Sequence, residues 1–157
     1  MALDIRTGTH AASFPTKVAS MMGQYGHVYN MVLSADHDNG NLIGRGAYVS
    51  FDQYTEAAVP QGFAGRINEQ AADGKWLIEV TALGEGETLY VYNSATSPYT
   101  ERSLRNEKLF YNADGDVVQG ATLIVGDVIA VSAEGITGTP AANTAVTYNA
   151  TTKKYEV

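Results

Sequence analysis

The chain of 157 residues contains no cysteine. It can therefore form neither a disulfide framework nor a thiolate metal site, and its assembly is compatible with a reducing cytoplasm. Its three histidines, His10, His27 and His37, do not have the spacing of metal ligands. We therefore predict that the protein holds no metal and no cofactor.

Charge is also scarce, and positive charge does not cluster. Charged residues make up 17% of the chain, with 10 Lys and Arg against 17 Asp and Glu, for a net charge of -7. A nucleic-acid-binding protein needs a positive patch to displace counterions, so we predict no nucleic-acid partner. The most apolar window, 121–133, is interrupted by Asp127 and is too short to cross a bilayer, and residues 1–8 lack the pattern of a signal peptide. We expect no membrane contact.

The motifs of catalysis are missing as well. No Gly-x-Ser-x-Gly nucleophile elbow occurs, and Gly44-Arg45-Gly46 lacks the third glycine of a dinucleotide-binding loop. The carboxylate pairs Asp36/Asp38, Glu85/Glu87 and Asp114/Asp116 each flank or occupy a predicted turn, where acidic side chains are commonly solvated. We therefore predict that the protein is not an enzyme.

What the chain does have is a β pattern with frequent turns. Trp76, Ile78 and Val80 alternate with polar residues, as expected of a half-buried strand. Asn39-Gly40 between two apolar runs predicts a tight hairpin that joins strands 27–33 and 42–51. We predict ten short strands, at 27–33, 42–51, 63–68, 75–83, 88–92, 108–112, 117–123, 128–132, 144–149 and 153–157. Their spacing predicts an all-β fold, either a small barrel or a sandwich.

The first 24 residues differ from the rest, because they show no alternation of apolar and polar residues. We predict an extended N-terminal arm over 1–24 and a β domain over 25–157, with a division into two subdomains near 93–106 left open. The arm carries several apolar side chains, which either fold back on the chain's own barrel or dock on a neighbouring subunit.

Tyrosine is the most abundant aromatic residue, with ten copies. Core packing, an assembly interface and a sugar-stacking surface are all compatible with this surplus. The residues that we expect at a capsid or subunit contact come from the arm and from the predicted loops 54–62 and 93–106, and they are Leu3, Ile5, Phe14, Val18, Met21, Met22, Tyr54 and Tyr99.

A family resemblance lies mainly in the last third of the chain. Lys108–Gly115 leads through a turn into a strand, and Leu123–Ser132 contains a Leu-x-x-Gly-Asp strand entry. With the closing hairpin Tyr148–Val157 and the segment Asn39–Tyr48, these motifs make residues 26–157 resemble the decoration (cement, or auxiliary head) proteins of tailed-phage capsids. The chain departs from that pattern at Val117–Thr122, which is uncharged where such proteins often carry a basic residue.

The resemblance implies a structural protein of the virion that binds the outside of the capsid and reinforces the shell. It implies that the major capsid protein is the partner, that the protein also associates with itself as a homotrimer, and that it is made in the cytoplasm of a bacterial host. Two other functions stay open: a phage tail or baseplate adaptor, and a carbohydrate-binding β module. The expected burial of Trp76 speaks against the last of these.

Overall fold

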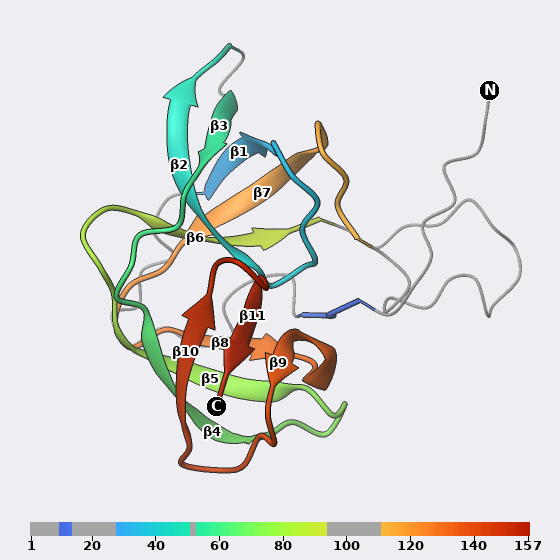
Figure 1. The fold of residues 1–157 in the computed structure, drawn as a ribbon, viewed down its shortest axis with the longest axis vertical. Coiled ribbons are helices and arrows are strands. Elements are labelled where there is room, and N and C mark those ends of the chain that lie inside the picture. Colours follow the sequence, from blue (N-terminus) through green and yellow to red (C-terminus); the bar gives the residue numbers. More distant parts are fainter. Residues whose placement is uncertain (1–9, 14–27, 51–52, 94–110) are drawn as a thin grey trace, which may run out of the picture.

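The computed structural model describes residues 10–13, 28–50, 53–93 and 111–157. Within these residues the chain forms eleven β-strands and one short 3-10 turn, η3 (Ala133–Gly135). The prediction of an all-β protein is confirmed. The strands belong to a closed barrel and an open sheet, which occupy the upper and lower halves of Figure 1.

The barrel has five strands in the order β1-β3-β2-β6-β7. They are β1 (Val28–Val32), β2 (Leu42–Tyr48), β3 (Gln53–Ala57), β6 (Thr88–Tyr92) and β7 (Val117–Thr122). All neighbours are antiparallel except β1 and β3, which run parallel. Each strand has a partner on both sides, so the barrel has no free edge.

The second sheet is open and has six strands in the order β8-β5-β4-β10-β11-β9. They are β4 (Ala64–Gln70), β5 (Trp76–Ala82), β8 (Val128–Val131), β9 (Ile136–Thr137), β10 (Ala145–Asn149) and β11 (Lys154–Glu156). Two predicted hairpins occur in it, β4–β5 across Asp73-Gly74 and the closing hairpin β10–β11.

Two strands of the barrel separate the two hydrophobic cores. On β6, Leu89 and Val91 point into the barrel, while Tyr90 and Tyr92 pack in the core that the barrel shares with the open sheet. On β2, Ile43 points into the barrel, while Leu42 packs in the shared core. Successive side chains of a strand point to opposite faces, so a wall between two cores must be apolar on both faces.

The hairpin predicted at Asn39-Gly40 does not form. A turn is present, because Gly40 has φ 92° and the Asn41 N–H donates to the Asp38 carbonyl at 3.2 Å. However, β1 pairs with β3 and β7, and β2 pairs with β3 and β6. The turn therefore redirects the chain within the barrel instead of pairing the strands on either side of it.

The loop predicted over 54–62 is also partly wrong, since β3 occupies Gln53–Ala57. Pro60 suggested an irregular connection, but it lies beyond the last residue of the strand. As a strand, this segment pairs with both β1 and β2 and so is needed to close the barrel.

Only part of the predicted arm falls within the described residues. Residues 10–13 lie against β8, where Ser13 forms an antiparallel bridge with Val131. The open division near 93–106 falls almost wholly outside the described residues, so it stays a prediction. The sheets themselves alternate along the sequence, because the barrel strands β6 and β7 follow β4 and β5 of the open sheet and precede β8.

Candidate functional site

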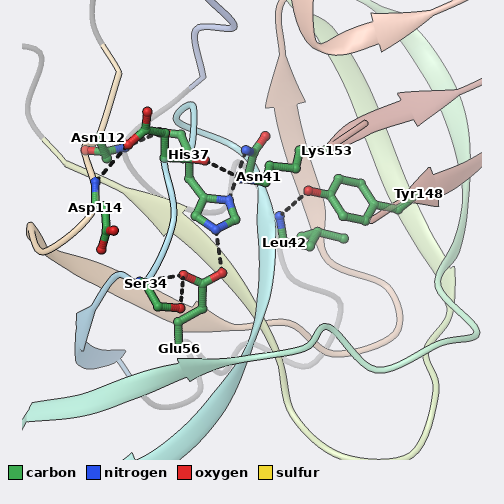
Figure 2. A network of polar contacts seen from close by, with 10 residues as sticks. Ser34, His37, Asn41, Leu42, Glu56, Asn112, Asp114, Tyr148 and Lys153 are labelled. Atoms are coloured by element: carbon green, nitrogen blue, oxygen red, sulfur yellow. Dashed lines mark hydrogen bonds and ion pairs between the residues drawn. The ribbon is translucent and has the colours of Figure 1, made fainter. Parts of the chain in front are cut away.

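A buried polar cluster lies where the barrel meets the open sheet, and Figure 2 shows it at close range. Its centre is His37, which is 5% exposed and whose Nε2 lies 2.5 Å from Oε1 of Glu56 on β3. The other ring nitrogen, Nδ1, faces the side-chain amide of Asn41 at 3.2 Å. With the Asn41 oxygen turned toward the ring, that oxygen accepts from His37 Nδ1 and from the Asp38 N–H, and the amide nitrogen donates to the Lys153 carbonyl. Both ring nitrogens of His37 then have a hydrogen-bond partner, Glu56 on one side and Asn41 on the other.

Glu56 is the acceptor of this pair and of a second set of hydrogen bonds. Its Oε2 accepts from the backbone N–H of Ser34 at 2.9 Å and from the Ser34 hydroxyl at 3.2 Å. Burial raises the pKa of Glu56, but the hydrogen bonds from His37 and Ser34 together lower it more, so the pKa lies below its ordinary value. The charged form of Glu56 is therefore the one that the fold stabilises.

Asparagine side chains extend the cluster to Asn93, directly after β6, and to Asn112, which precedes the turn into β7. Asn39 Oδ1 accepts from the Asn93 N–H at 2.9 Å and from Asn112 Nδ2 at 3.0 Å. Asn112 Nδ2 also donates to the His37 carbonyl, and the backbones of His37 and Asn112 exchange two hydrogen bonds of 2.8 and 2.9 Å. The cluster thus ties together loops that are far apart in the sequence.

Two tyrosine hydroxyls connect the same loop to the open sheet. Tyr155 on β11 donates to the Gly40 carbonyl at 2.7 Å, and the Tyr148 hydroxyl on β10 accepts from the Leu42 N–H at 3.2 Å. Burial raises the pKa of Tyr148 to about 12 and also raises the pKa of Tyr155 well above its ordinary value. Both hydroxyls are therefore neutral in the folded protein at physiological pH.

A groove of about 610 Å³ opens beside this cluster, between residues 58–63 and the β10–β11 hairpin. His37 and Glu56 are among its lining residues. Their polar atoms are already hydrogen-bonded to each other, to Ser34 and to Asn41. The arrangement holds the loop 34–41 against β3, and neither side chain is left as a ready acid or base for a bound substrate.

A second cluster, which we call the aromatic end, lies at one end of the barrel. The Tyr54 ring makes edge contacts with the rings of Tyr29 and Tyr48, at centroid distances of 5.2 and 5.4 Å. The Arg45 guanidinium lies 4.9 Å from the Tyr29 centroid and 5.3 Å from that of Tyr54. Arg45 also donates to the Tyr29 hydroxyl at 3.2 Å and lies 3.6 Å from the Glu87 carboxylate.

The outer side of the aromatic end is apolar and exposed. Tyr48 is 59% exposed, Val49 52% and Val28 57%. These three residues belong to the same end of the barrel, because Tyr48 pairs with Tyr54 near the start of β3 and Val28 begins the parallel strand β1. In Figure 1 the β2–β3 hairpin projects beyond the other strands at this point. An exposed aromatic side chain with apolar neighbours and an adjacent arginine, as at Tyr48, is typical of protein contact surfaces.

Of the contact residues predicted from the sequence, the structure places only Tyr54, which it brings into the aromatic end. The other seven lie outside the described residues and stay predictions: Leu3, Ile5, Phe14, Val18, Met21, Met22 and Tyr99.

Arg45, Glu87 and His37 occur in motifs weighed above, but the sequence predicted neither the place of Arg45 and Glu87 in the aromatic end nor the pairing of His37 with Glu56. A charged residue between two glycines in a strand, Gly44-Arg45-Gly46, was the available signal for Arg45. Nothing local marks the pairing of His37 with Glu56, because it depends on strand β3, which was predicted as a loop.

Three of the six carboxylates at the predicted turns, those of Asp36, Asp38 and Asp116, accept hydrogen bonds from backbone N–H groups. Asp116 accepts from the Ala113 N–H, and Asp36 accepts from the Asp114 N–H, both at 2.9 Å. Within the described ranges, no three His, Cys, Asp or Glu side chains lie together so that they could hold a metal ion. The same residues include no helix with the length and hydropathy to cross a membrane.

Comparison with known proteins adds no identification, since no family model, no curated protein and no solved structure matches the chain.

Proposed function

We propose that the protein is a non-catalytic structural protein that binds the outer surface of a tailed-phage capsid and stabilises the shell. The observation that carries this proposal is the aromatic end, where exposed apolar side chains are held on a closed barrel. Strands fix the positions of these side chains, so little conformational entropy is lost when a partner docks. The resemblance of residues 26–157 to decoration proteins gives the partner, the major capsid protein.

The charge of the chain supports a protein partner that is added from solution. A net charge of -7 keeps the free protein soluble and opposes contact with DNA. Copies on a capsid occupy many equivalent sites, so a modest free energy at each site adds up to a large resistance to internal pressure. We propose that the copies associate as homotrimers on the virion after synthesis in the bacterial cytoplasm.

The test uses capsids that lack the protein and measures cosedimentation of the purified chain. We expect the wild type to bind, and Tyr48→Ser/Val49→Ser to bind at least about tenfold more weakly, since a truncated aromatic anchor costs about 1–2 kcal/mol or more. Val117→Ser is the matched control, because Val117 is 45% exposed but pairs with Val32 at the other end of β1. Equal binding by all three chains would remove the aromatic end as the contact and leave the capsid role in place.

Two further measurements separate the alternatives. Immunogold labelling should show many copies on the head, whereas labelling of the tail alone would favour the adaptor function. Particles that lack the protein should release DNA at a lower temperature than complete particles, with little change in assembly yield. Unchanged release together with clear binding on a glycan array would favour the carbohydrate-binding function instead.

A further inference from the structure

The open edge of β8 carries a site that is built to receive a short peptide segment. In the described structure, residues 10–13 fill it. The Ser132 N–H donates to the Ala12 carbonyl at 2.8 Å, and the Ala12 N–H donates to the Ser132 hydroxyl at 2.8 Å. Together with the bridge between Ser13 and Val131, these bonds cover the end of the edge strand.

The site has room only for small side chains. Ala11 and Ala12 are each 3% exposed and Ser13 is 6% exposed, so these three residues of the segment are as buried as the core. A Cβ added at Gly135 would lie 2.9 Å from the Ala11 Cβ, and one at Gly40 would lie 3.2 Å from the Ser13 Cβ. Both distances are shorter than ordinary van der Waals contact, so the glycines are what leaves room for the segment.

A carboxylate recognises the start of the segment. Asp38 Oδ2 accepts from the Ala11 N–H at 2.9 Å, and Asp38 Oδ1 lies 2.7 Å from His10 Nδ1. Ser13 meets Gly40 of the barrel loop and Val131 of the open sheet, so the segment lies where the two sheets meet, as the blue stretch in Figure 1 shows. The site therefore combines backbone pairing, shape and charge.

Every group of this site belongs to residues 38–135, far from the segment in sequence. Fourteen residues, 14–27, join the segment to β1, and a chain of that length spans at most about 50 Å when fully extended. A domain of this size is about 40 Å across, from its expected radius of gyration of about 15 Å. The sequence is thus long enough for the segment to reach the same site on an adjacent copy.

We propose that residues 10–13 also occupy this site on a second copy of the chain, so that neighbouring subunits exchange their N-terminal segments. The exchanged contacts are identical to those within one chain, which makes exchange a low-cost route to association. High local concentration, as on a particle surface, favours it. The proposal needs no capsid and does not depend on the proposed function.

The absence of cysteine makes a direct test available. Ser13→Cys and Val131→Cys, one in each of two chains of different tagged size, are mixed at high concentration, partly unfolded in urea, refolded and oxidised. Paired residues on adjacent strands lie about 4.5–5.5 Å apart between Cα atoms, which suits a disulfide. Exchange predicts a mixed disulfide dimer on a non-reducing gel. The control mixes Ser13→Cys with Val117→Cys, which places an exposed thiol on the barrel strand β7 and outside the site. We expect the mixed dimer to be at least about tenfold more abundant for the Ser13→Cys and Val131→Cys mixture than for this control.

A chain that carries both Ser13→Cys and Val131→Cys, oxidised when dilute, must close its own disulfide, which verifies the register. Ala12→Cys with Ser132→Cys is the second pair, at the next position of the same register, in case Val131→Cys does not fold. Closure within one chain but mixed dimers no more abundant than in the control would overturn the exchange. Failure of both pairs to close within one chain would overturn the site itself.

Discussion

The barrel and the open sheet bury their apolar side chains in different ways. The barrel encloses its own core, formed by Met31, Leu33, Ile43, Leu89, Val91 and Val118. The open sheet has no such enclosure and packs one face against β2 and β6, so that Leu42 and Tyr90 of the barrel belong to the core of the sheet. The sheet therefore needs the barrel as its second layer, and the shared wall should make both parts unfold together.

The two parts also differ in their edges. The barrel has none, whereas the open sheet ends at β8 and β9. An exposed edge strand invites pairing with other chains, and proteins limit this by covering the edge or by keeping it short. Both means occur here, because residues 10–13 cover β8 and β9 has only two residues. The open sheet therefore needs a covering segment, residues 10–13, which a closed barrel would not require.

The largest expected effect comes from truncating each core in turn. Met31→Ala in the barrel and Ile78→Ala in the sheet, both at 0% exposure, should each lower the free energy of unfolding by about 2–5 kcal/mol. Trp76, the only tryptophan, lies on β5 of the sheet and reports its unfolding by fluorescence. If the shared wall couples the two parts, Met31→Ala shifts the urea transition of Trp76 as much as that of far-ultraviolet circular dichroism. Separate transitions for the two signals would show that the barrel and the open sheet unfold independently.

The same contrast explains what the sequence could predict. The alternation of apolar and polar residues predicted which face of β5 is buried, and Ile78 and Val80 do lie in the core. A strand that is buried on one face has apolar residues at every second position, so this pattern can be recognised in the sequence. On β6 apolar residues on both faces indicated a strand but not its role as a wall, since that role depends on which sheets lie on either side.

Failures arose where partners are distant in sequence. Asn39-Gly40 does turn, but the choice of β3 and β7 as partners of β1 is decided by closure of the barrel. The polar cluster around His37 and the aromatic end were not predicted for the same reason. Their members come from segments that are far apart in the sequence, and no local period indicates such contacts.

The next largest effect is expected from removing the charge of Glu56 in the polar cluster around His37. Glu56→Gln should lower the free energy of unfolding by about 2–3 kcal/mol at neutral pH, because it removes a charge-assisted hydrogen bond from a side chain that is only 12% exposed. Glu69→Gln, at an exposed position on β4, is the control and should change it by no more than about 0.5 kcal/mol.

The contribution of Glu56 to the free energy of unfolding should depend on pH. The pKa of Glu56 is lowered by folding, so its contribution is present above the unfolded pKa and is lost as the pH falls through the folded one. The difference between wild type and Glu56→Gln should therefore be largest near neutral pH and shrink in acid, below a pH of about 4.3. A difference that stays constant with pH would show that the Glu56 charge is not what stabilises the cluster.

A smaller effect is expected from removing the cover of β8. Deletion of residues 1–13 should leave the β fold in place by circular dichroism and lower the free energy of unfolding by about 1–2 kcal/mol, because the entropy cost of ordering the segment offsets most of what its hydrogen bonds and the burial of Ala11 and Ala12 contribute. The freed edge should also make the chain aggregate faster on warming, as measured by light scattering. Gly135→Val in the full-length chain should produce the same aggregation, because the added side chain collides with Val131 of β8 and with Ala11 and so disturbs both the edge and its cover. An unfolded truncated chain would mean that the segment is part of the core.

The smallest effect concerns the two hydroxyls that connect the sheet to the barrel loop. Tyr155→Phe should cost about 1–2 kcal/mol, since it leaves the Gly40 carbonyl without its 2.7 Å donor, and Tyr148→Phe should cost about 1 kcal/mol through a longer contact of 3.2 Å. Folding raises the pKa of both hydroxyls, so the unfolded chain loses these protons first as the pH rises above about 10. Stability should then fall with rising pH between about 10 and 12, and each phenylalanine variant should make that fall less steep because one titrating group has been removed. Urea titrations at several alkaline pH values measure both effects. Tyr48→Phe is the control, because the exposed ring of Tyr48 takes no part in the hydrogen bonds between the sheet and the barrel loop. If all three variants keep the slope of the wild type, the hydroxyls do not couple the sheet to the barrel, and the apolar wall of β2 and β6 holds the two parts together alone.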